Sequence, residues 1–522
     1  MHKEGRALRA WAYALALIVF CLPVMSPDVW WHLSAGRWIW AHCSIPFADA
    51  FSFTRAGTAW IDFEWGFQLL LYPFGLFGDW GLWTAKALLL ALAFFPIDGL
   101  LRDRRASPVE RALGAALWAA AVLPKSDLRA DLISAAFFAW QLRRLAFGKA
   151  SFAAGFIAFA LWANLHAGFV IGLVLYPAWA LVQRAAREER PRDLGAEACG
   201  AALGTLLNPY GLSLYTVFVT HALDPVRTGV KEWGPFSLRY PFQWPLAVML
   251  VVGAVIAWRA RRRAPGLAYA ALALTAATVY SSRFSAYWPA AAVPLLAASV
   301  PAEAALALLS LLFAVSLRAV DWGRPYQDVF VARRAADFVV AERAVFAPLR
   351  LFNTYEWGGY LGWRLGAESR VYGDGRYLFH GQIAELQEAL SGSAPMAAFV
   401  ERNRLDALLI RNYPERLPGV RLYPDGSRRE LARPWYVAYL PRERWALVWW
   451  DRQALLFVDR SKAAAGWLTA HEYRWWRPGD AEALADALAR GEASAAAVEA
   501  EKARQNLLSQ TSNHVNEALR PP

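Results

Sequence analysis

Residues 27–65 read PDVWWHLSAGRWIWAHCSIPFADAFSFTRAGTAWIDFEW and follow directly on the first apolar segment of the chain. This stretch gathers several acids, two histidines and six tryptophans. Carboxylates so close to a membrane segment are costly unless they line a wet cavity. The stretch is therefore the first candidate for a functional site.

The composition of the whole chain indicates a membrane protein. Of 522 residues, 57% are hydrophobic and only 19% are charged, which is too apolar for a soluble globule. The formal net charge is +12, but the basic residues fall in short clusters between apolar segments. Such clusters are typical of membrane topology, so we expect no nucleic-acid partner. The three cysteines form neither a disulfide framework nor a zinc-binding spacing.

Apolar runs near the length needed to cross a bilayer recur along the first 320 residues. They predict about eleven transmembrane helices, at 10–25, 80–101, 108–123, 130–147, 150–165, 167–183, 196–218, 243–258, 265–280, 284–299 and 301–318. A shorter apolar piece at 66–78 is expected on the membrane surface. The first run lacks a small-residue cleavage site, so we interpret it as an uncleaved span.

The distribution of basic residues predicts the orientation. With the N-terminus in the cytoplasm, the cytoplasmic loops hold arginine and lysine clusters at 102–111, 143–149, 184–192 and 259–263. This pattern satisfies the positive-inside rule. We therefore expect a multi-pass protein of a bacterial inner membrane, with membrane lipids as partners. An odd number of spans puts the region after 320 on the extracytoplasmic side, together with the 27–65 stretch.

The sequence predicts three regions. Residues 1–320 form a transmembrane domain whose large first external loop covers 26–66, and residues 321–462 form an extracytoplasmic α/β domain. Residues 463–522 form a helical C-terminal tail. The α/β assignment depends on short β-like runs at 349–352, 370–372, 407–410, 446–450 and 454–458.

Several polar clusters interrupt the apolar sequence at positions that this topology puts outside. They are Lys125 to Arg129, Asn164 to Gly168, Asn208 to Gly211, Lys231 to Trp233, Arg283, Asn353 to Tyr360 and Tyr372 to Arg376. Each has a structural alternative. The Pro209 motif is typical of a helix break, Asn164 and His166 can cap helix ends, and Glu356 can order a turn.

Asp28 lacks such an alternative, because an anion immediately past the first span has no obvious structural task. A carboxylate there can take a proton from an acceptor hydroxyl or bind a divalent cation, Mg²⁺ or Mn²⁺. Asp62 and Glu64 return near the membrane before the next apolar segment. The catalytic candidates are thus Asp28, Glu64, Asp62 and His32.

The chain also resembles a known superfamily in a series of short motifs between the N-terminus and about residue 460. These are Asp28-Val29-Trp30-Trp31-His32-Leu33, Gly36-Arg37-Trp38-Ile39, Ile45-Pro46, Asp49-Ala50-Phe51-Ser52-Phe53-Thr54, Glu64-Trp65, Asn164-Leu165-His166, Asn208-Pro209-Tyr210-Gly211, Glu232-Trp233 and Asn353-Thr354-Tyr355-Glu356-Trp357-Gly358-Gly359-Tyr360. They resemble the GT-C superfamily of integral-membrane glycosyltransferases. The likeness is greatest to bacterial family 39-type proteins, which are related to protein O-mannosyltransferases and to the lipid A aminoarabinose transferase.

The resemblance implies a multi-span core, a catalytic carboxylate in the first external loop and a soluble C-terminal domain on the same side. It also implies a sugar donor carried on a polyprenyl phosphate, with a lipid, glycan or protein as acceptor. Asp28 then corresponds to the general base, and Arg283 and Arg129 neutralise the departing phosphate. The other expected substrate-binding residues are Arg37, Asn164, His166, Glu232, Tyr355, Glu356 and Arg376.

One feature departs from the superfamily pattern and leaves the chemistry open. Many relatives carry two acids adjacent or one residue apart, whereas Asp28 is followed by Val29 and two tryptophans. A second acid must then come from Glu64 or Asp62, and metal dependence stays open. Two other functions also stay open: a transporter or flippase for a lipid-linked saccharide, and a non-catalytic subunit of an envelope polysaccharide assembly complex.

Overall fold

A computed structural model describes residues 2–186, 193–223, 234–328, 330–366, 370–423 and 426–511. The chain divides into two compact units. The first contains residues 1–26, 35–45 and 61–327. The second contains residues 27–34, 46–60 and 328–522.

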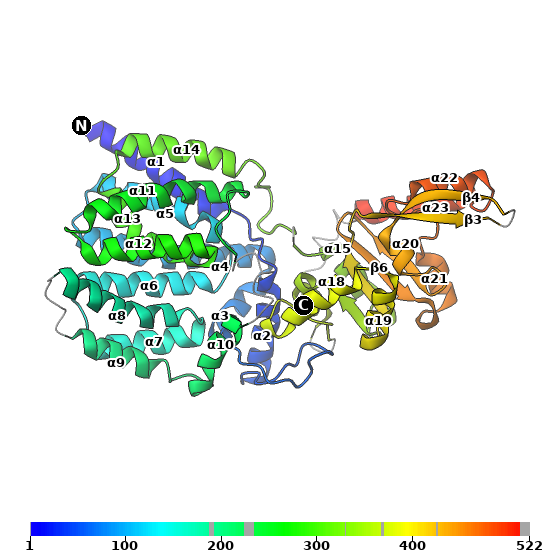
Figure 1. The fold of residues 1–522 in the computed structure, drawn as a ribbon, viewed down its shortest axis with the longest axis horizontal. Coiled ribbons are helices and arrows are strands. Elements are labelled where there is room, and N and C mark those ends of the chain that lie inside the picture. The colour runs from blue at the N-terminus through cyan, green and yellow to red at the C-terminus, as the bar shows by residue number, and fades with distance from the viewer. Residues whose placement is uncertain are drawn as a thin grey trace. The chain divides into compact units, whose positions relative to one another are not determined.

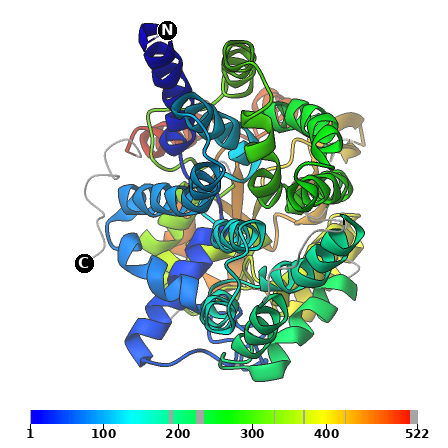
Figure 2. The same ribbon diagram turned by 90° about the vertical axis from the view of Figure 1, so that its left-hand side faces the viewer.

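The first unit is built from helices. They are α1 (His2–Cys21), the second half of α2 (Asp28–His42), α3 (Trp65–Gly75), α4 (Gly78–Asp103), α5 (Pro108–Val122), α6 (Asp131–Ala146), α7 (Phe152–Leu165), α8 (Phe169–Ala186), α9 (Leu194–Gly204), α10 (Thr216–Leu223), α11 (Trp244–Ala260), α12 (Pro265–Tyr280), α13 (Trp288–Ala297) and α14 (Ala302–Ser316). Most of them run roughly parallel or antiparallel in Figure 1, and Figure 2 views them nearly end-on. A single apolar core of alanine, leucine and aromatic side chains fills the space between them.

Glycines decide how closely two of these helices pack. Gly200 and Gly204 lie one turn apart on α9 and face α7. A Cβ atom on Gly204 would lie 2.2 Å from the Phe156 carbonyl oxygen of α7, and one on Gly200 would lie 2.2 Å from the Phe152 oxygen. Small residues at such spacing let helix backbones approach closely, which gains van der Waals contact where burial from water supplies no driving force.

We expect Gly204→Ala to destabilise the protein, because the added methyl group must push the α7 backbone aside. Overpacking of this kind costs about 1–3 kcal/mol. Gly195, on the same helix, is the matched control, since a Cβ there meets nothing within 4 Å. The thermal unfolding midpoint of the detergent-solubilised protein should fall for Gly204→Ala and not for Gly195→Ala. Equal midpoints for the two variants contradict the packing argument.

A buried carboxylate joins four helices of this unit. Glu197 of α9 is fully buried and pairs with Arg144 of α6 at 3.0 Å. It also accepts hydrogen bonds from the Tyr176 hydroxyl of α8 and from the backbone N–H of Ser151, which caps α7. Because each oxygen has donors, the buried charge is compensated rather than orphaned.

Within the described residues, three helices are long and apolar enough to cross a membrane. They are Gly78–Asp103, Phe169–Ala186 and Pro241–Ala260. The other predicted runs also contain helices, but these are shorter or carry more charge, so the expected count of eleven spans is not confirmed. Prolines account for part of the shortening. The run at 196–218 is divided between α9, the 3₁₀ helix η2 (Gly211–Tyr215) and α10, with Pro209 at the break.

The second unit carries a four-stranded sheet with the order β1-β2-β6-β5. The strands are β1 (Leu351–Asn353), β2 (Ala407–Arg411), β5 (Trp445–Trp450) and β6 (Ala454–Asp459). β1 and β2 are parallel, and the other pairs are antiparallel. These strands coincide with four of the five predicted β-like runs. The fifth run contributes only an isolated bridge between Val371 and Ser52.

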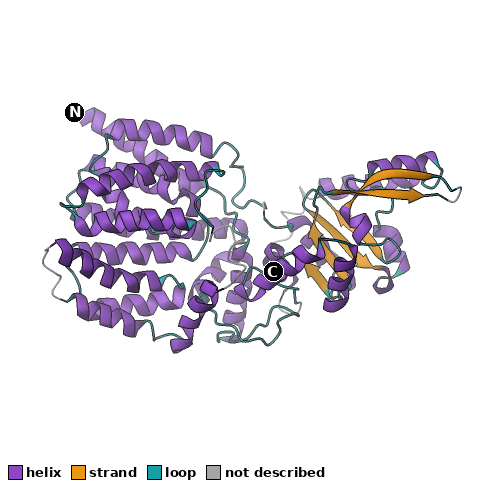
Figure 3. Cartoon of the chain, in the orientation of Figure 1, coloured by secondary structure: helices purple, strands orange, loops and turns teal. Residues whose placement is uncertain are grey.

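Helices and a separate hairpin complete the second unit (Figure 3). They are α15 (Arg333–Ala341), α16 (Arg343–Phe346), α17 (Gly358–Leu365), α18 (His380–Ala389), α19 (Ser393–Asn403), the hairpin strands β3 (Arg416–Leu422) and β4 (Arg428–Pro434), α20 (Trp435–Tyr439), α21 (Ala465–His471), α22 (Ala481–Ala489) and α23 (Ala495–Thr511). The hairpin was not expected, because its strands carry Pro418, Gly419 and many arginines instead of an apolar alternation.

The 27–65 stretch differs from the expected external loop in two ways. Residues 28–42 form α2, a helix with Asp28 in its first turn, where a carboxylate interacts favourably with the helix dipole. The stretch is also shared between the units, because residues 27–34 and 46–60 cluster with the second unit and not with the helical one. The rest of the second unit begins at residue 328.

Candidate functional site

Asp28 lies against a glycine loop of the second unit. A Cβ atom on Gly375 would lie 2.7 Å from the Asp28 Oδ1 atom and 3.0 Å from the Trp31 ring, so only glycine permits this approach. The Tyr355 hydroxyl donates to the Gly375 carbonyl oxygen at 2.6 Å. The structure therefore brings together Asp28 and Tyr355, two of the predicted residues, through the Gly373-Asp374-Gly375 loop.

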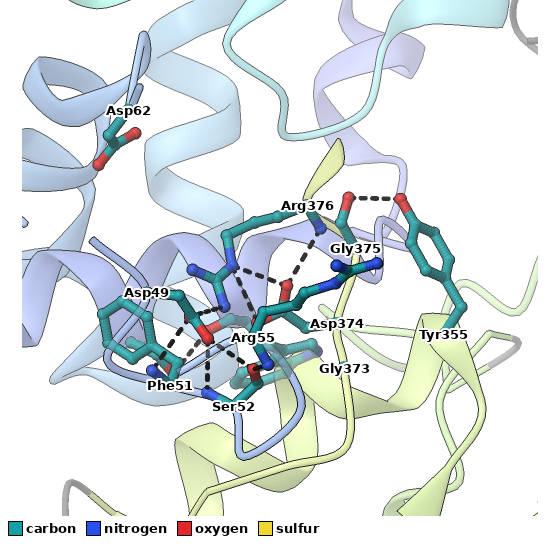
Figure 4. Close-up of polar contacts among 12 residues, drawn as sticks. Asp49, Phe51, Ser52, Arg55, Asp62, Tyr355, Gly373, Asp374, Gly375 and Arg376 are labelled. Carbon is teal, nitrogen blue, oxygen red and sulfur yellow. Dashed lines mark hydrogen bonds and ion pairs between the residues drawn. The ribbon is translucent and has the colours of Figure 1, made fainter. Parts of the chain in front are cut away.

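Arg376 follows this loop and is fully buried between two carboxylates (Figure 4). Its Nη2 atom pairs with Asp49 at 2.7 Å, and its Nε atom pairs with Asp374 at 2.8 Å. Burial alone lowers the pKa of Arg376, but the two carboxylates raise it above its ordinary value. Asp49 belongs to the 46–60 segment, so these ion pairs hold that segment against the rest of the second unit. Arg376 therefore has a structural role.

We expect Arg376→Gln to destabilise the second unit by about 3–5 kcal/mol, because it leaves two buried carboxylates without a counter-charge. Arg416→Gln is the matched control. That arginine pairs with Glu482 at 3.0 Å, but both side chains are at least 40% exposed, so its loss should cost no more than about 1 kcal/mol. Hydrogen exchange of residues 46–60 measures the difference. Similar protection in both variants is the contrary result.

The aromatic side chains that follow Asp28 pack against neighbouring rings. Trp30 meets the Tyr360 ring edge-on at 4.8 Å, and the Arg333 guanidinium lies over both rings. Trp31 contacts the His32 ring at 3.6 Å between centroids. Burial raises the pKa of the Tyr360 hydroxyl, which donates to Asp337. These contacts hold the start of α2, and with it Asp28, in one orientation.

A second polar cluster lies in the first unit around His166, the residue that directly follows α7 and caps its C-terminal end. The backbone N–H of Gly168 donates to the His166 Nδ1 atom at 3.1 Å, so that nitrogen is an acceptor. Trp162 donates its indole N–H to the Ser134 oxygen at 2.6 Å, which leaves the Ser134 hydroxyl to donate to Nδ1, also at 2.6 Å. The proton of a neutral ring then sits on Nε2. That atom lies 3.7 Å from the Glu64 Oε1 atom.

Basic side chains gather in the same unit near Glu64. Arg283, in the 3₁₀ helix η5 (Ser282–Ala286), lies within electrostatic range of Asp131, Glu64 and Arg129. Lys125 pairs with Asp131 at 3.5 Å. The structure thus brings together four predicted residues, Glu64, Arg129, His166 and Arg283, from segments far apart in the sequence.

Two other predicted residues of this unit make contacts typical of structural roles. Asn164 accepts from the Trp65 indole at 3.0 Å and donates to the carbonyl oxygens of Ala160 and Leu207. Asp62 is buried and accepts from the Gln68 side chain at 2.7 Å, just before α3 begins. Both therefore order the junction that presents Glu64. Arg37, on α2, lies within electrostatic range of Tyr72 of α3.

Two predicted substrate-binding residues, Glu356 and Glu232, remain. Glu356 pairs loosely with Arg411 at 3.7 Å, and both side chains are more than a third exposed. A pair of that kind contributes little to stability. Glu232 lies outside the described residues.

Carboxylates and histidines of the site are also the side chains that could hold a metal ion. Among the described residues, no group of three histidine, cysteine, aspartate or glutamate side chains could hold a metal ion. Asp28 belongs to the second unit and Glu64 to the first.

Comparison with solved structures now identifies the fold. One match is the oligosaccharyltransferase AglB from Archaeoglobus fulgidus in complex with an inhibitory peptide and a dolichol-phosphate, at 12% identity and a TM-score of 0.53, covering 83% of this chain and 74% of that one. An Archaeoglobus fulgidus oligosaccharyltransferase in the apo form matches at 11% identity and a TM-score of 0.56, covering 89% and 81%. The fold resembles that of GT-C glycosyltransferases.

This likeness confirms, for the fold, the resemblance drawn from the short motifs. A third match is ArnT from Cupriavidus metallidurans bound to undecaprenyl phosphate, at 13% identity and coverage of 87% and 98%, but its TM-score of 0.43 is too low to carry an argument. No protein-family model matches the sequence. No curated relative matches it either.

Some members of the two clusters were not singled out from the sequence. Ser134 is a single polar residue inside the apolar helix α6, and nothing in the sequence shows that it meets His166. Asp131 follows the predicted Lys125 to Arg129 cluster by two residues, so a wider window would have found it. Asp49 lay in a quoted motif, but its partner Arg376 is more than three hundred residues away.

Proposed function

We propose that the chain transfers a sugar from a polyprenyl-phosphate donor to a hydroxyl group of an acceptor at the extracytoplasmic face of a bacterial inner membrane. The observation that carries this proposal is the meeting of Arg129 and Arg283 with Glu64 and His166 inside an otherwise apolar helical unit. Charged side chains inside apolar helical segments are costly, and in a membrane protein they mark a functional site. Two arginines at such a site suit an anionic ligand.

In this proposal the anion is the phosphate of the donor lipid. The Arg283 and Arg129 guanidinium groups suit a phosphate because each offers several donors in a planar fork. The AglB structure to which this chain is similar contains a dolichol-phosphate, and we extend that class of ligand to this chain. The apolar helix surfaces of the first unit supply contacts for the lipid tail.

The transfer itself requires a base and a stabilised leaving group. Asp28 accepts the proton of the acceptor hydroxyl, and the acceptor oxygen forms a bond to the anomeric carbon of the sugar. The bond between that carbon and the phosphate oxygen breaks, and its electron pair stays on the phosphate. The arginines stabilise the charge that develops there. Attack from the face opposite the phosphate inverts the configuration of the sugar.

Glu64 and His166 have a positioning role in the proposal. The hydrogen-bond chain from Trp162 through Ser134 fixes the His166 ring, whose Nε2 proton faces Glu64. Glu64 in turn lies within electrostatic range of Arg283. A carboxylate held in this way restrains the position of the Arg283 guanidinium.

The experiment is a single-turnover assay with the purified full-length chain in lipid nanodiscs. Candidate donors are undecaprenyl-phosphate mannose, glucose and aminoarabinose, offered with envelope extract as the source of acceptors. Mass spectrometry follows the appearance of free undecaprenyl phosphate, which only bond cleavage produces. Release with at least one donor is the expected result.

The alternatives predict different products. A transporter or flippase would move the intact donor across the bilayer without producing free undecaprenyl phosphate. An assembly subunit would neither move nor cleave the donor, even when protein and donor are present in equal amounts. Either outcome, obtained with protein whose thermal unfolding is cooperative, overturns the transferase proposal.

A further inference from the structure

A cavity of about 430 Å³ lies within the second unit. Its lining residues fall between 417 and 487 and include parts of β3, β4, α20 and α22. Figure 1 draws the β3–β4 hairpin beside α22. A volume of this size fits a small molecule. Its walls combine apolar side chains, among them Val420, Leu431 and Val437, with four arginines and a single acid, Asp480.

Two of the four arginines are already neutralised. Arg433 makes a two-pronged contact with Asp480, with both nitrogen–oxygen distances at 2.7 Å. Arg421 pairs with Asp486 at 2.9 Å and with Glu492. Their charges therefore stabilise the unit and are not available to a ligand.

The other two arginines have no such partner. Arg442 and Arg474 both lie near the Trp475 ring, with guanidinium carbons 5.5 Å and 5.6 Å from the ring centroid. Among the described residues, neither guanidinium bonds to a carboxylate. The one hydrogen bond that Arg442 makes through Nη2 is to the Arg474 carbonyl oxygen at 3.2 Å. Glu472 and Asp480 lie within electrostatic range of Arg442, but these acids already pair with Arg460 and Arg433. Both guanidinium groups line the cavity.

A third arginine adds to this imbalance. Arg477 is only 7% exposed, and its Nη2 atom is buried without a hydrogen-bond partner. Burial and the charge of Arg442 lower the pKa of Arg477 to about 10. Leaving a buried charged donor without a hydrogen-bond partner is costly. An anion bound at Arg442 would offset the repulsion between Arg442 and Arg477.

We propose that this cavity binds a phosphate ester with an apolar or planar body. Arg442 and Arg474 would hold the phosphate oxygens in their forks. Trp475 and the apolar wall of β3 would contact the body of the ligand; Val420 and Leu422 on that strand are 59% and 67% exposed. The site is independent of the sugar-transfer reaction, because none of its residues belongs to the clusters around Asp28 or Arg283.

The test uses calorimetry on the full-length chain in nanodiscs with phenyl phosphate as probe. We expect one binding site per chain, with tighter binding than that of inorganic phosphate or phenol. Dihexanoyl phosphatidic acid is the second probe: tighter binding than phenyl phosphate assigns a lipid source, and weaker binding assigns a soluble ester. Failure of both esters to bind at millimolar concentration, or equal binding of phenol, overturns the proposal.

Variants locate the site. The double variant Arg442→Gln/Arg474→Gln should weaken binding at least tenfold, whereas Arg452→Gln, an exposed arginine in the β5–β6 turn, should change it less than twofold. Val420→Glu is a second variant that leaves the arginines intact and adds a negative charge to the exposed wall, so it should also weaken binding tenfold. Equal losses in Arg452→Gln, or unchanged affinity in both cavity variants, contradict the assignment.

Discussion

Replacing Asp28 with asparagine is expected to lower the rate of sugar transfer by about 10²–10⁴-fold while donor binding is retained. Asparagine has nearly the same shape but cannot accept the proton of the acceptor hydroxyl, and general-base catalysis contributes a factor of this size. The single-turnover assay measures the rate, and binding of the labelled donor is measured separately.

The structural role of Asp28 cannot account for so large a loss. As an acid in the first turn of α2, it stabilises the helix by about 0.3–1 kcal/mol, which corresponds to at most about fivefold in an equilibrium. Glu303 is the matched control, because it is an exposed acid in the first turn of α14. Glu303→Gln removes a similar helix-dipole interaction and should leave transfer unchanged. Full transfer by Asp28→Asn would falsify the assignment of the base.

The second large effect is expected at Arg283. Arg283→Gln should lower kcat/KM for the donor by about 10²–10³-fold, because one preorganised contact to the developing phosphate charge is lost. Part of the loss should appear as weaker binding of undecaprenyl phosphate itself, since the product carries the same phosphate. Arg283→Lys keeps the charge but not the planar fork, so it should restore only part of the activity.

Arg318→Gln is the control for this series, because Arg318 is an exposed arginine just past α14. It removes the same net charge from the first unit without touching the cluster around Glu64. Unchanged undecaprenyl-phosphate binding in Arg283→Gln, or an equal loss in Arg318→Gln, contradicts the phosphate role. The role of Asp28 is tested by the rate of sugar transfer, and the role of Arg283 is tested by binding of undecaprenyl phosphate, so either assignment can fail while the other holds.

Much of the fold follows from local sequence. Apolar runs at helical length predicted where most helices of the first unit lie, because burial among other helices requires apolar residues on nearly every face. Apolar β-branched and aromatic runs likewise predicted β2, β5 and β6 to within two residues. Helices α22 and α23 were expected after Pro478-Gly479-Asp480, where alanine becomes abundant.

Two elements, α2 and the β3–β4 hairpin, were not predicted from the sequence, and each has a physical reason. α2 was not expected because its tryptophans and its acid suggested an interfacial loop, and its helical pattern is weak. The β3–β4 hairpin was not expected, because no apolar alternation marks its strands. Its arginines pair instead with acids of α22 and of the turn that follows it. In both cases distant side chains stabilise an element that local propensity leaves undecided.

The sequence by itself determined that residues 27–65 carry an acid with no obvious structural task, and that polar clusters recur at the ends of apolar helices. Composition and periodicity are local properties, so they suffice for such conclusions. Only the tertiary structure decided that Glu64, Arg129, His166 and Arg283 meet in one cluster. Likewise, only it decided that Asp28 packs against Gly375 and that Arg376 is held by Asp49. These pairs join residues up to about three hundred positions apart, and no local pattern specifies which distant partner satisfies a buried charge.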